Sequence, residues 1–487
     1  MLLWRGDETV QILNKAKGID LTSIAFRADE LAAVSGGRLF VGSPDTTLCR
    51  FAVDSRSVVS GDVFVAIRGD RFDGHRFVDD AFEAGAIGAI VRDTTAIREV
   101  GDQRIGIVVD DAISALQRIA QAVRRRSKAR VVAITGSVGK TTTKELTATL
   151  LSKKYRVFRN EGNLNNHIGL PLSLLELHCC PEVAVVELGM NHAGEISELV
   201  KIAEPDVRVW TNVAEVHSAS FNSIEEIADA KAEILEGATA DSELVVNASD
   251  HRVMNRIAGF SGRVTTFGVK ADADVRAVDL VDSGIDGITA SIQVSEERFK
   301  LRTKLIGEGN IANILAALCV AIRFNVPLEK LIETVEVFSA QKRRGEVSKL
   351  SRGVTVVDDS YNSNPTALRS MLRSVGVDTF HTRHVAVLGE MLELGNRSLS
   401  LHRECGRAVA EAGFTHCVSV GGTEAKALSD GALAAGLPVA SVSTFETSDR
   451  ASEAVLEMVR PGDLILVKGS RATRTDRIVD CLKEEWA

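Results

Sequence analysis

The chain has 487 residues, of which 45% are hydrophobic and 25% charged, and it carries a formal net charge of −8. This length predicts about three domains, and the acidic balance gives no sign of a nucleic-acid partner. No apolar run reaches the roughly 18 residues that a membrane span needs, and the charged start MLLWRGDETV is not a secretion signal. Seven cysteines without CxxC spacing are typical of reduced thiols, so we expect a cytoplasmic protein without a disulfide framework or a zinc site.

The N-terminal part of the sequence divides into an extension and a first domain. Residues 1–20 are a polar extension, and short apolar strands alternate with helical stretches over residues 21–115. The basic run Arg124–Arg126 follows this block, and we interpret it as a solvated linker. The adjacent thiols Cys179 and Cys180 are interpreted as part of a turn.

Two further α/β blocks follow, which we place at residues 116–342 and 343–487. The first contains the apolar strands VVAIT, VAVVELG, VRVWTNV and ELVVNAS, separated by helical segments. Continuous apolar strands of this kind predict a parallel sheet covered on both faces. The alternation in ITASIQV (288–294) indicates a small antiparallel addition. The last block repeats the α/β rhythm, with strands that end in polar residues or glycine, where ligands of open α/β sheets bind.

The sequence VVAITGSVGKTTTKE (131–145) runs from an apolar strand through a glycine-bearing loop into a helix. Backbone N–H groups of such a loop, together with the helix dipole, bind phosphate groups. Lys140 adds a positive charge, and the hydroxyl of Thr141 can ligate Mg²⁺. The eight-residue P-loop pattern would place glycine at Ile134, so only the short form TGxxGKT is present. We therefore predict nucleotide binding, against the alternative of an ordinary strand–turn–helix junction.

Three further residues are candidates on their position. Glu187 and His217 each follow an apolar strand, although either could be a solvated or structural residue. Lys231 falls on the apolar stripe of the helix in SIEEIADAKAEILEG. A buried lysine is costly, so its amine either reaches the surface by snorkelling or is neutralised at a functional site, for example by carbamylation.

Two polar loops complete the candidate site. GNLNNHIGLP (162–171) offers asparagine amides that either shape turns or contact a polar ligand, and DDSYNSNP (358–365) follows an apolar strand. Dense polar functionality at a strand end is more often a binding site than not.

Taken together, these motifs resemble the Mur ligase family of ATP-dependent amide-forming ligases, over roughly residues 21–487. The resemblance rests on DSRSVVSGDVFVAIRGDRFDGHRF, TGSVGKTTTKE, GNLNNHIGLP, ELGMNHAGEI, TNVAEVH, AKAEI, GEGNIANILAA, DDSYNSNP, LGEMLELG and GDLILVKGSR, in the family's order. It implies a three-domain α/β architecture: a UDP-sugar-peptide-binding domain (21–115), a central P-loop ATPase domain (116–342) and a Rossmann-like C-terminal domain (343–487) that binds the incoming amine. Within the family, DDSYNSNP, ELGMNHAGEI and LGEMLELG look like the enzyme class that adds D-alanyl-D-alanine to UDP-N-acetylmuramoyl-tripeptide.

The resemblance also implies roles for individual residues, with ATP and Mg²⁺ as the cofactors. The catalytic residues would be Lys140, His217 and Lys231. The nucleotide would be bound by Gly136, Ser137, Val138, Gly139, Lys140, Thr141, Thr142, Asn310, Asn313, Arg344 and Asp359. The metal ligands would be Thr141, Glu187, His217 and a carbamylated Lys231. The other substrates would contact Ser55, Arg56, Gly74, His75, Asn165, Asn166, Tyr361, Asn362 and Asn364.

The expected reaction passes through an acyl phosphate, which the amine of D-alanyl-D-alanine attacks to give the pentapeptide precursor of peptidoglycan. The partners would be these small molecules, with no nucleic acid and no membrane span, and we expect a monomer. Three alternatives remain: the preceding ligase of the family, a folylpolyglutamate synthase, and a nucleotide-dependent switch that binds a muropeptide without joining it.

Overall fold

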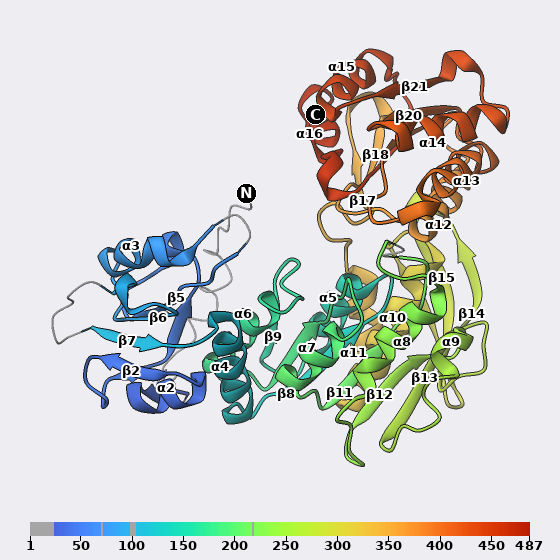
Figure 1. The fold of residues 1–487 in the computed structure, drawn as a ribbon. Helices are drawn as coiled ribbons and strands as arrows, with labels where there is room; N and C mark the ends of the chain where they lie inside the picture. Colours follow the sequence, from blue (N-terminus) through green and yellow to red (C-terminus); the bar gives the residue numbers. More distant parts are fainter. Residues whose placement is uncertain (1–23, 70–71, 98–103, 217–218) are drawn as a thin grey trace.

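The computed structural model describes residues 24–69, 72–97, 104–216 and 219–487, so the extension 1–20 lies outside these ranges. Three larger sheets with their helices follow one another along the described residues, besides a two-stranded sheet of β1 (Phe26–Arg27) and β3 (Thr47–Leu48), and the predicted α/β fold class is confirmed. The N-terminal part (blue) and the C-terminal part (red) attach to different sides of the central part (Figure 1). Across the described residues, no helix is long and apolar enough to cross a membrane.

The N-terminal part is built on a five-stranded sheet with the order β2-β7-β6-β5-β4. Neighbouring strands from β4 to β7 run parallel, and β2 joins β7 antiparallel. Its elements are β1 (Phe26–Arg27), α2 (Ala28–Ser35), β2 (Arg38–Val41), β3 (Thr47–Leu48), β4 (Arg50–Ala52), β5 (Asp62–Val65), α3 (Val78–Glu83), β6 (Gly88–Val91) and β7 (Ile105–Val108).

Helix α4 (Ala112–Arg126) crosses the expected domain boundary at 115/116 and joins the first two parts. It contacts α2 on one side and α6 and α7 on the other. The interpretation of Arg124–Arg126 as a solvated linker is wrong. Arg124 is buried at the end of α4, where its guanidinium donates to the carbonyl of Ala203 (2.8 Å) and pairs with Asp206 (2.8 Å). The helix is therefore fixed to the central domain by side-chain contacts that a periodicity argument does not reveal.

The central part contains a nine-stranded sheet with the order β16-β15-β14-β13-β12-β11-β8-β10-β9. Strands β8 to β14 are parallel, while β15 and β16 add the antiparallel extension that the alternation in 288–294 predicted. Its elements are β8 (Arg130–Thr135), α5 (Lys140–Leu151), β9 (Val157–Arg159), α6 (Gly169–Leu175), β10 (Val183–Glu187), α7 (Glu195–Ala203), β11 (Val207–Trp210), α8 (Ile224–Ala232), β12 (Glu243–Asn247), α9 (His251–Met254), β13 (Arg263–Val269), β14 (Val275–Asp282), β15 (Ile288–Val294), β16 (Glu297–Thr303), α10 (Glu308–Arg323) and α11 (Leu328–Val337).

The central strands are buried on both faces, as their continuous apolar sequences predict. Along β8, Val131 and Ala133 pack into the hydrophobic core shared with the N-terminal part. Val132 and Ile134 point to the other face and pack into a second core that includes α5 and α10. Helices on both faces therefore hold the sheet in place, and the ends of its strands remain available for a binding site.

The C-terminal part has a six-stranded sheet with the order β17-β18-β22-β19-β20-β21, in which only β17 is antiparallel. Its elements are β17 (Glu346–Lys349), β18 (Thr355–Asp359), α12 (Pro365–Gly376), β19 (Arg383–Gly389), α13 (Ser398–Glu411), β20 (His416–Val420), α14 (Thr423–Ala434), β21 (Val442–Phe445), α15 (Ser448–Met458), β22 (Asp463–Lys468) and α16 (Asp476–Glu485). This part contacts the central one through Ser374, whose hydroxyl donates to Asp282 (2.8 Å), and through the ion pair of Arg397 with Glu215 (2.8 Å).

Candidate active site

The predicted phosphate-binding loop lies at a reversal of strand order in the central sheet. Strand β8 leads into the loop and lies between β10 and β11, and all three strands are parallel. From β8 the chain continues to β9 and β10, which lie on one side of β8 in the strand order, and then crosses to β11 on the other side. The carboxyl ends of β8, β10 and β11 therefore meet around the loop. Ligands of open α/β sheets bind at such a reversal.

Two glycines give the loop its conformation. Gly139 has φ +85° and is the N-cap of α5, and a Cβ there would lie 2.1 Å from Oδ1 of Asn313. Gly136 has φ +152°, and a Cβ on it would lie 1.9 Å from Oγ1 of Thr211. Both positions therefore require glycine, and they bring the backbone against neighbouring polar side chains. The start of α5 directs its free N–H groups into the space that an anion would occupy.

The loop is also held by Asn212, to which the sequence analysis gave no role. Its Oδ1 accepts from the N–H of Val138 (2.9 Å), and its amide donates to the carbonyl of the same residue (2.8 Å). The hydroxyl of Ser137 exchanges further hydrogen bonds with the backbone of Ala214. Asn212 follows β11, so only the adjacency of β11 and β8 brings it to the loop. TNVAEVH contains the residue, but nothing in that sequence indicates its partner.

Thr141 and Glu187 form the centre of the candidate metal site. The hydroxyl of Thr141 donates to Oε2 of Glu187 (2.8 Å), while Oε1 accepts from the amide of Asn165 (2.7 Å). Glu187 is 3% exposed, so the interpretation of this residue as a solvated strand end is wrong. A hydroxyl and a carboxylate are oxygen ligands that Mg²⁺ prefers, so the residues present fit that ion.

A second asparagine, Asn160, supports Glu187 from behind. Its Oδ1 accepts from the backbone N–H of Glu187 (3.0 Å), and its carbonyl accepts from the ammonium of Lys144. Lys144 is fully buried within α5 and is also paired with Glu145 (3.1 Å). The sequence analysis did not predict a role for Lys144, because a lysine in a helix that follows a P-loop is usually solvated and nothing in the local sequence indicates its burial.

Two lysines approach this centre from different helices. Lys140 starts α5, and its ammonium donates to the carbonyl of Gly136 (2.8 Å). Lys231 lies in α8 and is 1% exposed, which excludes snorkelling to the surface. Burial lowers the pKa of Lys231 well below its usual value, and the nearby charge of Lys140 lowers it further. Burial also lowers the pKa of Lys140, against the opposing influence of the Glu187 carboxylate. His217, the remaining predicted catalytic residue, lies outside the described residues.

The C-terminal domain reaches the P-loop through Arg344. Its guanidinium lies 3.4 Å from the hydroxyl of Thr141, and it stacks 3.9 Å from the ring centroid of Tyr361. Arg471 lies over the same ring at 6.0 Å. Tyr361 thus lies close to two cations beside the loop, and Arg471 is a further candidate that the sequence analysis quoted in GDLILVKGSR without assigning it.

Asp359 is held by a lysine that was also not assigned. Strands β18 and β22 are parallel neighbours, and their register places Asp359 opposite Lys468. Lys468 is 3% exposed, and its ammonium donates to Oδ2 of Asp359 (2.6 Å) and to the carbonyl of Asn362 (2.9 Å). The side chain of Asn364 accepts from the N–H of Ala367 and caps α12. The polar loop after β18 is therefore ordered by its own hydrogen bonds.

The predicted adenine-binding residues lie at the start of α10. Asn313 is buried, and its Oδ1 accepts from the hydroxyl of Thr143 (3.2 Å) while its amide donates to Asn310 (3.0 Å). Because Asn313 also lies against Gly139, α10 and the P-loop are in direct contact. Asn166 shapes the turn before α6, because its Oδ1 accepts from the N–H of Gly169 (2.8 Å), the first residue of that helix.

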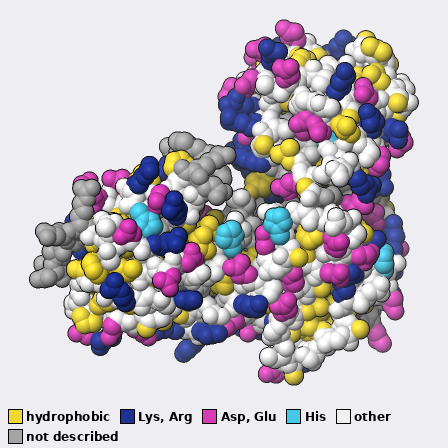
Figure 2. Space-filling model, viewed as in Figure 1, with side chains coloured by type: hydrophobic (Ala, Val, Ile, Leu, Met, Phe, Trp, Pro, Cys, Tyr) yellow, Lys and Arg dark blue, Asp and Glu magenta, His cyan; other side chains and the backbone are white. Residues whose placement is uncertain are grey.

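The predicted uridine-binding residues are all in the N-terminal domain, and the side-chain hydrogen bonds of Arg56 and His75 are made to other residues of that domain. Ser55 and Arg56 lie in a 3₁₀ turn, and Gly74 and His75 lie in another. Nδ1 of His75 lies 2.7 Å from Asp73, which fixes its ring. Figure 2 shows this face of the molecule hollowed between the N-terminal and C-terminal domains.

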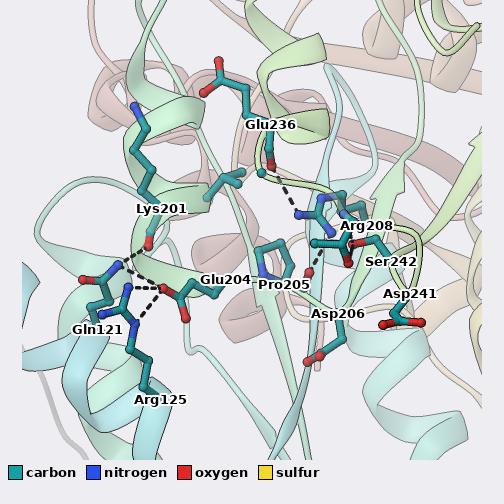
Figure 3. Close-up of a pocket in the computed structure, with 13 residues that line it drawn as sticks. Gln121, Arg125, Lys201, Glu204, Pro205, Asp206, Arg208, Glu236, Asp241 and Ser242 are labelled. Atoms are coloured by element: carbon teal, nitrogen blue, oxygen red, sulfur yellow. Dashed lines mark hydrogen bonds and ion pairs between the residues drawn. The ribbon is translucent and has the colours of Figure 1, made fainter. Parts of the chain in front are cut away.

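A separate pocket of about 520 Å³ lies away from the P-loop (Figure 3). It is formed by α4, the end of α7 and the residues that precede β11 and β12, so it lies near the amino ends of the strands. Its charged groups are largely satisfied within the protein. Arg125 pairs with Glu204 (2.7 Å), and Arg208 donates to the carbonyls of Pro205 and Ile234. The pocket contains none of the predicted site residues.

Comparisons with known proteins agree with this geometry. Residues 51–124 match the Mur ligase family, catalytic domain; residues 134–321 match the Mur ligase middle domain; and residues 343–471 match the Mur ligase, glutamate ligase domain. The chain is 33% identical to the UDP-N-acetylmuramoyl-tripeptide--D-alanyl-D-alanine ligase of Bacillus subtilis (strain 168), over 90% of this chain and 94% of that protein.

Solved structures show the same likeness. A crystal structure of MurF from Acinetobacter baumannii superposes with a TM-score of 0.84 and 30% identity, covering 95% of this chain and 99% of the other. MurF from Thermotoga maritima in complex with ADP gives a TM-score of 0.78 and 29% identity, covering 90% and 97%. With matches to all three family domains and relatives that align over nearly their whole length, the chain belongs to the Mur ligase family.

Proposed function

We propose that the protein is an ATP-dependent ligase that joins D-alanyl-D-alanine to UDP-N-acetylmuramoyl-tripeptide. The observation that carries the reaction type is the convergence of the P-loop, Glu187 and two lysines at one edge of the central sheet. The choice of the two substrates is supported by the UDP-N-acetylmuramoyl-tripeptide--D-alanyl-D-alanine ligase of B. subtilis, which aligns with this chain over 94% of its own length. A folylpolyglutamate synthase of Mycobacterium tuberculosis is only 16% identical, which supports a shared fold and no more.

In the proposed reaction, the terminal carboxylate of the tripeptide attacks the γ-phosphate of ATP, which gives an acyl phosphate and ADP. The amine of D-alanyl-D-alanine then attacks the acyl carbon, and inorganic phosphate leaves. The loop 136–142 would hold the phosphates through its backbone N–H groups, and Lys140 would place a positive charge beside them. Arg344 would bring a second cation from the C-terminal domain, because it already lies 3.4 Å from Thr141.

Thr141 and Glu187 would hold one Mg²⁺, and His217 with a carbamylated Lys231 would hold a second. When bound, Mg²⁺ neutralises charge on the phosphate oxygens. The burial of Lys231 supports the carbamate, because the modification turns a poorly solvated amine into an anion that can pair with Lys140.

The three parts of the chain would divide the substrates among them. The N-terminal domain (21–115) would bind the uridine end through Ser55, Arg56, Gly74 and His75, and the C-terminal domain (343–487) would bind the dipeptide near Tyr361 and Asn362. None of the seven cysteines, all of which lie in the described residues, forms a disulfide, which supports a reducing cytoplasmic location. Basic and acidic side chains are interspersed over the face in Figure 2, consistent with small-molecule substrates and a monomer.

Phosphate release tests the proposal directly. Purified protein with ATP, Mg²⁺ and UDP-N-acetylmuramoyl-tripeptide should release phosphate when D-alanyl-D-alanine is added, and not when a single amino acid is added. Turnover with a free diamino acid and UDP-N-acetylmuramoyl-dipeptide would identify the preceding ligase instead. Binding of the nucleotide and the muropeptide without any release would favour a switch.

The carbamate is tested by Lys231→Ala. This variant should lose most ligase activity, and small carboxylates such as formate or acetate should restore part of it by occupying the space of the missing group. Full activity of the variant without any added carboxylate would refute the assignment. Lys201→Ala, which changes an exposed lysine in α7, is the matched control and should retain activity.

A further inference from the structure

Three side chains with metal-binding atoms gather in the short 3₁₀ helix that follows α6, at residues Glu176–Cys179. A carboxylate oxygen of Glu176, a ring nitrogen of His178 and the sulfur of Cys179 all lie within 4.8 Å of one another. A 3₁₀ helix brings side chains at i and i+3 into line, which explains why Glu176 and Cys179 share a face. This cluster plays no part in the proposed ligase reaction.

The hydrogen bonds of His178 leave one nitrogen available as a ligand. Nδ1 lies 2.9 Å from the carbonyl oxygen of Leu175, and because a carbonyl only accepts, Nδ1 must carry the proton. Nε2 is then the unprotonated nitrogen of a neutral ring, and it faces the sulfur of Cys179 at 3.6 Å. Histidines that bind metals commonly have their other N–H fixed by a backbone carbonyl in this way.

The separation of these two atoms fits a tetrahedral zinc ion. With a Zn–S bond of about 2.3 Å and a Zn–N bond of about 2.0 Å, tetrahedral ligands lie about 3.5 Å apart. The observed distance between Nε2 and Sγ is 3.6 Å, which matches the spacing of two ligands on one ion. The carboxylate of Glu176, in an exposed side chain, would complete three protein ligands and leave one position for water.

A further carboxylate and an arginine lie beside the cluster. Asp62 in β5 is 3% exposed, and its charge acts on both Glu176 and His178. Its Oδ1 receives no hydrogen bond from the described residues, and it is 3.2 Å from Nε of Arg50 in an ion pair. Arg50 therefore lies beside two carboxylates, those of Asp62 and Glu176. Burial raises the pKa of the Cys179 thiol to about 11, so a bound metal ion would have to displace its proton.

We propose that Glu176, His178 and Cys179 bind one Zn²⁺ ion at the junction of the N-terminal and central domains, contrary to the expectation from the cysteine spacing that the protein has no zinc site. The 3₁₀ helix contacts α4, and α6 immediately before it contacts β4, so the ion would lie beside the contact between the two domains. Nitrogen and sulfur ligands select zinc over magnesium, whereas the oxygen ligands at Thr141 and Glu187 favour magnesium. The two sites would therefore be occupied independently.

Cobalt substitution tests this proposal in the full-length protein. The chelator-treated, reduced protein is titrated with Co²⁺ in the presence of excess Mg²⁺ and ADP, which occupy the P-loop site. We expect one equivalent of Co²⁺ to give a thiolate-to-cobalt charge-transfer band, and one equivalent of Zn²⁺ to remove it. Cys179→Ser should abolish the band. Cys180→Ser is the matched control, because that sulfur donates to the carbonyl of His178 (3.5 Å), and it should keep the band.

A second variant and a second measurement keep the proposal testable if Cys179→Ser does not fold. His178→Gln should weaken Zn²⁺ binding by at least about tenfold in competition with a chromophoric chelator, because it removes one ligand. Zn²⁺ should also raise the melting temperature of the wild type and of Cys180→Ser, and not that of His178→Gln. The proposal is overturned if the wild type gives no charge-transfer band, if Cys179→Ser keeps it, or if His178→Gln binds zinc as tightly as the wild type.

Discussion

The substitution Gly139→Ala should weaken nucleotide binding strongly, and the structure gives its size. Gly139 has φ +85°, a left-handed conformation that costs a residue with a Cβ about 1–2 kcal/mol. The new methyl would also lie 2.1 Å from Oδ1 of Asn313, so that side chain must move. Its hydrogen bonds to Thr143 and Asn310 would then be lost, at about 1 kcal/mol each.

These costs act mainly on the nucleotide-bound state. In the Gly139→Ala variant without a ligand, we expect the loop to relax to a conformation that alanine tolerates. Bound phosphates require the left-handed conformation at residue 139, so the strain returns when the nucleotide binds. We expect a loss of about 3–4 kcal/mol, which corresponds to a binding constant for MgADP weaker by about 100- to 700-fold. Isothermal titration calorimetry measures this loss, and thermal melting of the free variant confirms that it is folded.

Gly194→Ala is the matched control for this prediction. Gly194 is also a left-handed N-cap, with φ +90° at the start of α7, but a Cβ there would have no atom within 4 Å. The control carries the same backbone strain without the clash, so its affinity for MgADP should stay within about twofold of the wild type. The reasoning is refuted if Gly139→Ala binds MgADP as tightly as the wild type, or if Gly194→Ala loses as much.

Two further predictions concern the C-terminal domain. Lys468→Met should lower the free energy of unfolding by about 3–5 kcal/mol in urea titrations, because it leaves the buried carboxylate of Asp359 without its partner. Lys483→Met removes a half-exposed pair with Glu346 (3.7 Å) and should cost under about 1 kcal/mol; equal losses would contradict the argument. Burial raises the pKa of Asp358 above its ordinary value of 3.8, so its ionisation destabilises the folded state as the pH rises through the folded pKa. Asp358→Asn should therefore match the wild type below pH 3.8 and become the more stable of the two toward pH 7, and a difference independent of pH would count against it.

The sequence predicted the local features of this protein well. The strand, glycine loop and helix of 131–145 form as expected, because the apolar run, the glycines and the helix-forming residues each act over a few neighbours. The position of Lys231 on the apolar stripe of α8 was likewise readable from helical periodicity, because it is a local property. Periodicity left open whether the amine reaches the surface, and the structure shows that it is buried.

The tertiary structure decided which distant residues meet. Asn212 holds the P-loop only because β11 lies beside β8, and Lys468 pairs with Asp359 only because β22 lies beside β18. Strand order depends on the packing of whole helices over the sheet, and no local pattern in the sequence contains it. Arg124 shows the same limit, because its charge suggested solvent while its hydrogen bonds to α7 bury it. Sequence therefore determined where each candidate group stands along the chain, and the fold determined its partners.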